Sequence, residues 1–318
     1  DGYVAGELLL LACAPEPTET GEIIYPHPDE WREVVGPPDP FVRWSDGSTV
    51  ATQADWAARR AELLTLFRYY EYGHEPVLAE PTVVGTTNPT ATSRELSVEF
   101  EGGAFRLLIL LPDGEGPFPV LLGQNACGNA AVAADLPLDP PASWVDTDQC
   151  DGGQDPYWPT SEALSRGVAV ATFHQSDIQP DDPDETGILQ SLDVPTEPDT
   201  AWGTIAAWSY GVSLATTVLL SQPEIEPDKI YVWGHSRRGK VALWAAALDT
   251  RIAGAWAHQS GTGGAALART LDGESIDAIN LLFPHWFNEW FPLFGGRETY
   301  FPVDQHLLIA AIAPRAVR

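Results

Sequence analysis

The fold of this chain is indicated most strongly by the stretch Val232–Lys240, which reads V-W-G-H-S-R-R-G-K. A short β-rich segment at 230–232 leads into it, and a helix-forming segment follows at 241–248. A serine at such a strand-to-helix turn is held clear of the sheet, where backbone N–H groups and the helix dipole stabilise negative charge. We therefore interpret Ser236 as a candidate nucleophile for acyl transfer. The usual pattern is G-x-S-x-G, and Gly239 comes one position late, so a turn with a capping serine is the alternative interpretation.

The segments on both sides of this turn alternate between strand and helix patterns. Alternation of this kind predicts a parallel sheet with helices on both faces, and hence an α/β fold. We find no internal repeat. Strands are expected at 82–85, 94–99, 105–111, 119–122, 168–173, 230–233 and 252–257, and helices at 53–70, 201–221 and 241–248.

Composition excludes several classes of function. The chain has 318 residues, enough for one large domain, and its 17 lysines and arginines against 45 aspartates and glutamates give a net charge of -28. That charge repels nucleic acid phosphates and anionic membrane surfaces. No apolar stretch reaches the ~20 residues that a membrane-spanning helix needs. We therefore expect neither a nucleic acid partner nor a membrane span.

Further motifs follow the serine in a fixed order. They read A-H-Q-S-G-T-G-G at 257–264, F-P-H-W-F at 283–287, P-V-D-Q-H at 302–306 and I-A-P-R at 312–315, with weaker matches upstream that include D-I-Q-P-D at 177–181. Together with G-H-S-R-x-G-K they resemble the glucuronoyl esterases of carbohydrate esterase family 15, particularly the bacterial branch. The resemblance implies a three-layer α/β-hydrolase fold with a mostly parallel sheet. It also implies that the protein is an ester hydrolase that needs no cofactor.

The same resemblance implies roles for individual residues. Ser236 matches the nucleophile, and Arg237 matches the arginine that stabilises the oxyanion through its backbone N–H and guanidinium. Lys240 matches the lysine that binds hydroxyls of the glucuronate sugar. Gln259 lies where the family usually has its catalytic glutamate, and an amide can orient a histidine but cannot stabilise an imidazolium as a carboxylate does.

The substrate implied by the resemblance is an ester between 4-O-methyl-glucuronic acid on xylan and a lignin alcohol. Two alternatives stay open, an acetylxylan or general carboxylesterase and a non-catalytic carbohydrate-binding or scaffold protein on an esterase fold. The sequence has no H-E-x-x-H motif and no paired cysteine spacing, so we expect no metal site.

The N-terminus has the composition of an export segment. The run L-L-L-L-A-C at 8–13 resembles the end of a bacterial lipoprotein signal peptide, with Cys13 as the lipidated residue. We expect residues 1–13 to be the remnant of that signal, 14–45 to be a flexible tether and lead-in segment, and 46–318 to be the esterase domain. A lipid anchor would be the only contact with a membrane, and the location would be the cell envelope or the exterior.

Three further points concern what the sequence leaves open. Some bacterial members of the family take the triad acid from a later loop, and the catalytic histidine of the family lies further on still. Because Gln259 is no acid, we expect both residues beyond Arg318, which makes the domain incomplete at its C-terminus. The seven histidines of the chain are expected to be structural. Cys127 and Cys150 either form a disulfide or stay free thiols.

Overall fold

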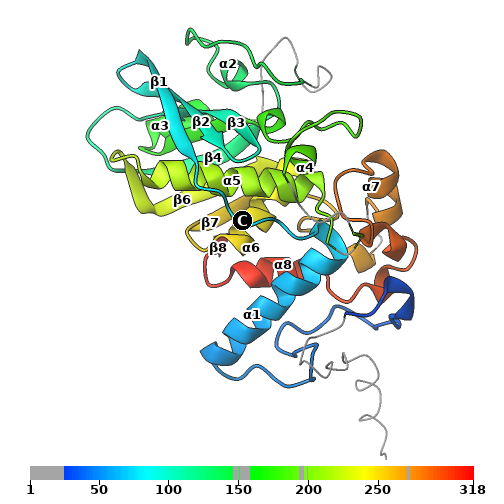
Figure 1. Cartoon of the computed structure of the whole chain (residues 1–318). Coiled ribbons are helices and arrows are strands. Elements are labelled where there is room, and N and C mark those ends of the chain that lie inside the picture. Colours follow the sequence, from blue (N-terminus) through cyan, green and yellow to red (C-terminus); the bar gives the residue numbers. More distant parts are fainter. Residues whose placement is uncertain (1–24, 146–149, 151–157, 193–196, 199, 271–272) are drawn as a thin grey trace, which may run out of the picture.

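The computed structural model describes residues 25–145, 150, 158–192, 197–198, 200–270 and 273–318. Within these residues an eight-stranded sheet forms the centre of the molecule, in the order β1-β2-β3-β5-β4-β6-β7-β8 (Figure 1). The strands are β1 (Thr82–Thr90), β2 (Ser93–Phe100), β3 (Gly103–Leu110), β4 (Phe118–Asn125), β5 (Ala169–His174), β6 (Ile225–His235), β7 (Gly254–His258) and β8 (Ala316–Val317). The helices are α1 (Gln53–Phe67), α2 (Asn129–Val132), α3 (Thr160–Ser165), α4 (Ile188–Ser191), α5 (Thr204–Leu220), α6 (Arg237–Leu248), α7 (Ile276–Leu282) and α8 (Gln305–Ile312).

The sheet has an antiparallel part and a parallel part. Strands β1 to β3 form an antiparallel meander, and β3 pairs antiparallel with β5. From β5 through β4, β6 and β7 to β8 every pairing is parallel. This confirms the predicted mostly parallel sheet.

Both faces of the sheet are covered by helices. Alternate residues of β5 point to opposite faces, as the pleat requires. Phe173 belongs to the large core, together with Leu214 of α5. Val170 belongs to a smaller cluster with Ala163 of α3. The fold therefore has three layers, as expected for an α/β-hydrolase.

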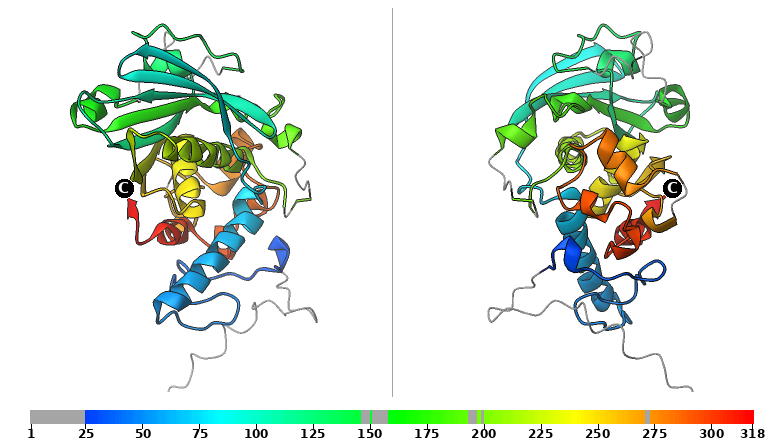
Figure 2. Two further views of the ribbon diagram at one scale, coloured as in Figure 1. Left: turned by 60° about the vertical axis from the view of Figure 1, so that its left-hand side comes forward. Right: turned by 90° about the vertical axis from the view of Figure 1, so that its right-hand side faces the viewer.

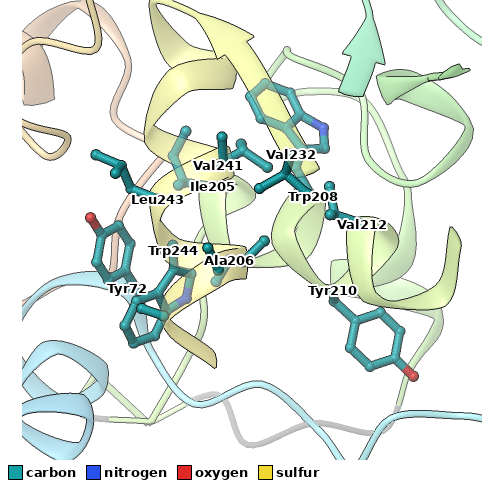
Figure 3. Packing of buried hydrophobic residues seen from close by; sticks show 14 of the residues in the cluster. Tyr72, Ile205, Ala206, Trp208, Tyr210, Val212, Val232, Val241, Leu243 and Trp244 are labelled. Carbon is teal, nitrogen blue, oxygen red and sulfur yellow. The ribbon is translucent and has the colours of Figure 1, made fainter. Parts of the chain in front are cut away.

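The nucleophile strand and helix are anchored in the largest part of the core. Helix α5 is apolar on nearly all sides, which is the pattern of a fully buried helix. Figure 3 shows Trp208 of α5 and Val232 of β6 together in this core, with Trp244 of α6 beside Tyr72. The rings of Trp244 and Tyr72 stack with centroids 4.3 Å apart. This packing fixes the two elements that carry the serine turn.

Helix α1 lies against the C-terminal helix α8, away from the antiparallel strands (Figure 2). The Arg60 guanidinium donates through Nε to the Ala311 carbonyl at 2.7 Å and through Nη2 to the Ala247 carbonyl. A single side chain thus ties α1 to the ends of both α6 and α8, because one guanidinium offers several donors in a fixed plane.

The predicted elements differ from the observed ones mainly at their ends. The helix expected at 53–70 ends at Phe67 and continues as a wider π-type turn over Arg68–Tyr72. The helix expected from 241 begins at Arg237, directly after the serine. Strand β6 begins at Ile225, earlier than the expected 230, because the stretch at 226–229, E-P-D-K, has no apolar pattern that would predict a strand.

Cys127 and Cys150 form a disulfide with their Cα atoms 5.7 Å apart, which decides between the two alternatives that the sequence left open. Cys13 lies outside the described residues. Part of the segment expected as a tether and lead-in packs on the domain, since the rings of Tyr25 and Trp31 contact those of Tyr69 and Tyr70. Within the described part of the chain, no helix is both long and apolar enough to cross a membrane.

Candidate active site

Ser236 lies at a sharp turn between the end of β6 and the start of α6. Its φ of 55° and ψ of -122° fall in a region that residues with a side chain rarely adopt. Backbone hydrogen bonds hold the turn, because Ser236 N donates to the His258 carbonyl at 2.9 Å and Gly239 N donates to the Ser236 carbonyl at 2.9 Å. The Ser236 side chain makes no capping hydrogen bond. The geometry favours the nucleophile interpretation over the capping serine.

Two glycines make this turn sterically feasible. A Cβ on Gly234 would lie 2.2 Å from the Arg238 carbonyl oxygen, a distance that real side chains do not reach. A Cβ on Gly239 would lie 3.0 Å from both the Gly234 carbonyl oxygen and the Ser260 Cβ. Gly239, which comes one position later than in the usual pattern, therefore lies where the turn leaves little room for a side chain.

Arg237 directs its guanidinium into a pocket of fixed groups. Nη1 donates to Asp181 Oδ2 in a short ion pair. The guanidinium carbon lies 4.7 Å from the ring centroid of Phe283 and 4.6 Å from that of Trp286, both within the range of cation–π attraction. The side chain remains 18% exposed, so these groups do not enclose it completely.

Asp181 was not singled out as a site residue by the sequence. Its side chain is fully buried, and Oδ1 accepts from His285 Nε2 at 3.1 Å and from Trp286 Nε1 at 2.8 Å. Burial by itself raises the pKa of Asp181, but the hydrogen bond from His285 and the charge of Arg237 outweigh it and hold that pKa below the ordinary value. The signal in the sequence was the motif at 177–181, which contains this aspartate.

Lys240 is buried on the first turns of α6. Its ammonium donates to the Ser260 carbonyl at 2.6 Å and to the Thr262 carbonyl, and it lies 3.7 Å from Glu274 Oε2. Burial lowers the pKa of Lys240 to about 8. In this structure the lysine supports the loop that follows β7. Its contact with a sugar stays a prediction.

A second buried acid lies on the same side of the core. Both carboxylate oxygens of Glu71 accept from Gln305 Nε2 at 3.1 Å. Burial raises the pKa of Glu71 to about 8, against the opposing effects of the Gln305 hydrogen bond and the Lys240 charge. Glu71 lies in Y-E-Y-G at 70–73, one of the weaker upstream matches, but it was not singled out as a site residue.

Gln259 follows β7 directly and is exposed, with φ of 47°. Gln259 lies close to the serine turn, because the residue before it, His258, pairs with His235 at the end of β6. The two imidazoles are in contact through their Nδ1 atoms at 2.8 Å. The role of Gln259 as an orienting residue stays a prediction.

Three other histidines have partners that suit a structural role. His174 binds the Ser143 hydroxyl, and His306 binds the Pro38 carbonyl. His285 binds Asp181 as described above. Among the residues whose placement is described, no group of three histidine, cysteine or acidic side chains could hold a metal ion.

Comparison with known proteins places the chain in one family. The sequence profile described as "Glucuronyl esterase, fungi" matches residues 152–318. Carbohydrate esterase MZ0003, from an unknown prokaryotic organism, is 35% identical over 308 residues, which cover 88% of this chain and 71% of that protein. The 4-O-methyl-glucuronoyl methylesterase of Podospora anserina is 29% identical, with 88% of this chain and 53% of that protein covered. A solved promiscuous family 15 esterase from the marine bacterial metagenome has a TM-score of 0.78 and 34% identity, over 91% of this chain and 79% of that one.

Proposed function

This chain belongs to the glucuronoyl esterase family, carbohydrate esterase family 15, and from that premise we propose that it is a serine esterase acting on glucuronate esters. The substrate class is the ester of 4-O-methyl-glucuronic acid that joins xylan to lignin alcohols. The observation that carries the proposal is the strained turn at Ser236, because such a conformation persists where function requires it.

The chemistry follows from the turn. Ser236 Oγ attacks the ester carbonyl and forms a tetrahedral intermediate, whose oxyanion accepts from the Arg237 backbone N–H and guanidinium. Collapse of the intermediate releases the alcohol with a proton and leaves an acyl-enzyme. Water then cleaves the acyl-enzyme and releases the uronic acid. A histidine base and its acid partner complete a triad of this kind, and we assign neither within the described residues.

Lys240 and Gln259 are proposed as further residues of the site. Lys240 is proposed to bind sugar hydroxyls when the loop at 260–262 opens for the substrate. Gln259 is proposed to orient the base from the position that usually holds an acid.

The test is hydrolysis of benzyl and methyl glucuronate esters, beside simple acetate esters, by the product of the full-length gene, which includes any triad residues that lie beyond Arg318. We expect glucuronate esters to be cleaved and Ser236→Ala to abolish turnover, because that change removes the nucleophile alone. Cleavage of acetate esters with equal kcat/KM would indicate a general carboxylesterase. Turnover that persists in Ser236→Ala would refute the assignment of the nucleophile.

Export is proposed to proceed through lipidation of Cys13. The supporting observation is the run L-L-L-L-A-C at 8–13. When the protein is expressed from its own gene in a bacterial host, we expect it in the membrane fraction. Cys13→Ser should release it, and Ala14→Ser, the neighbouring control, should not. Finding the unaltered protein in the soluble cytoplasmic fraction would contradict lipidation.

A further inference from the structure

A buried carboxylate connects the serine turn with the segment that follows α7. Asp181 accepts from three donors, Arg237 through Oδ2 and both His285 and Trp286 through Oδ1. The three donors come from two parts of the chain that are far apart in sequence. Because the Asp181 side chain is fully buried, no water competes for these bonds.

We propose that Asp181 is the positioning residue that fixes the Arg237 guanidinium beside Ser236. This inference rests on the proposed esterase function. Arg237 has a long side chain with many rotamers, and an oxyanion donor is effective only when its place is set before charge develops. Asp181 supplies the anchoring bond, and the rings of Phe283 and Trp286 restrict the plane of the guanidinium.

The carboxylate also balances the charge of the arginine. An isolated guanidinium next to the nucleophile would attract anions in general, including the uronate carboxylate that hydrolysis produces. The ion pair with Asp181 removes most of that net charge. The N–H groups that do not face Asp181 still donate to an oxyanion that forms at short range. Asp181 is therefore expected to weaken binding of the product without weakening transition-state stabilisation.

The variant that tests this role is Asp181→Asn, which keeps the size of the side chain and removes its charge. A matched control is Glu62→Gln, because Glu62 forms a comparably buried ion pair with Arg59 on α1. Both changes weaken one buried pair, so a loss of stability alone would appear in both proteins. Asp181→Glu, which retains the charge, serves as the rescue variant. Asp181→Ser, which is also neutral, replaces Asp181→Asn if that variant does not fold.

The first measurement follows the arginine itself and needs no activity. In the full chain labelled with ¹⁵N-arginine, the Arg237 guanidinium signals, assigned with Arg237→Lys, should show slow rotation and slow hydrogen exchange. In Asp181→Asn we expect exchange to accelerate by roughly tenfold or more, since an anchoring charged hydrogen bond is lost. Unchanged exchange in Asp181→Asn would overturn the proposal.

The second measurement is kinetic. Asp181→Asn should lower kcat on a glucuronate ester by roughly tenfold to hundredfold with a small change in KM, because a slightly misplaced group costs rate rather than binding. It should also tighten inhibition by free glucuronate. In an Arg237→Ala background the same change should have almost no further effect, and Glu62→Gln should keep the original kcat.

The outcomes distinguish a failure of the positioning role of Asp181 from a failure of the proposed esterase function. Full additivity of Asp181→Asn and Arg237→Ala would mean that Asp181 does not act through the arginine, and the positioning role would be refuted. If the unaltered product of the full-length gene cleaves no ester, the proposed function fails, and the guanidinium exchange still decides whether Asp181 holds Arg237.

Discussion

At the scale of single residues, the candidate site contains buried ionisable side chains whose hydrogen-bond partners are other groups of the protein. Lys240 is the clearest case, since its ammonium donates to the Ser260 and Thr262 carbonyls. A lysine in that position has two roles to be separated, support of the loop and contact with the substrate.

Lys240→Met separates these roles because methionine retains much of the bulk and loses the charge. If Lys240 binds uronate hydroxyls, kcat/KM should fall at least tenfold more for glucuronate esters than for acetate esters. The measurement is kcat/KM on both ester classes for both proteins. Equal losses would show that Lys240 acts through the loop alone.

Glu71 predicts a dependence of stability on pH. Its pKa rises from the ordinary 4.5 to about 8 in the folded protein, mainly through burial, so the folded state binds more protons than the unfolded state between these values. The contribution of Glu71 to stability is complete below pH 4.5 and is lost as the pH rises through 8. Glu71→Gln removes the titration. The Tm of the variant minus that of the unaltered protein should therefore increase from pH 5 to pH 8, and a flat difference would contradict the buried, protonated carboxyl.

At the scale of elements, the strand-to-helix turn of β6 and α6 depends on the absence of a side chain at Gly234. The turn concentrates the unusual backbone conformation in one residue, Ser236, while its neighbours keep regular geometry. Any atom added at Gly234 must displace the Arg238 carbonyl, which lies in the first turn of α6.

Gly234→Ala should therefore move the start of α6 and lower both Tm and kcat. The expected loss of stability is about 1–3 kcal/mol, the range for overpacking a tight site. Gly85→Ala in β1 is the matched control, since its Cβ would meet Ser97 at an ordinary 3.5 Å. Thermal unfolding and ester hydrolysis of both variants provide the check, and normal activity of Gly234→Ala would show that the turn relaxes.

At the scale of the whole molecule, the excess negative charge and one disulfide act on stability independently of the site. A net charge of -28 imposes repulsion that salt screens, and the disulfide closes a loop between residues 23 apart in sequence. The bond links the segment after β4 to the chain that precedes α3.

Removing the disulfide should shift the equilibrium toward the unfolded state. Closure of a loop of this length contributes about 3 kcal/mol through the reduced entropy of the unfolded chain. We expect the double change Cys127→Ser with Cys150→Ser to lower the free energy of unfolding by about that amount in denaturant titrations, with kcat nearly unaltered. An unchanged midpoint would mean that the unfolded chain is already compact in this region.

The sequence by itself determined the strand-to-helix turn, the three-layer α/β class and the likeness to one esterase family. These properties depend on local patterns, because a β-rich run, a glycine pair and a helix-forming run lie within a few residues of Ser236. The ends of helices and strands were less predictable. In β6, for example, the polar stretch at 226–229 shows no hydrophobic alternation that would mark it as part of a strand.

Only the tertiary structure decided which distant groups meet. The sequence separates Asp181 from Arg237 by 56 residues and from Trp286 by 105. Parallel strands bring their carboxyl ends to one edge of the sheet, and only there do the loops that carry these residues approach each other. The buried states of Glu71 and Lys240 were likewise not predictable, because a pKa depends on desolvation and on neighbours that packing alone supplies.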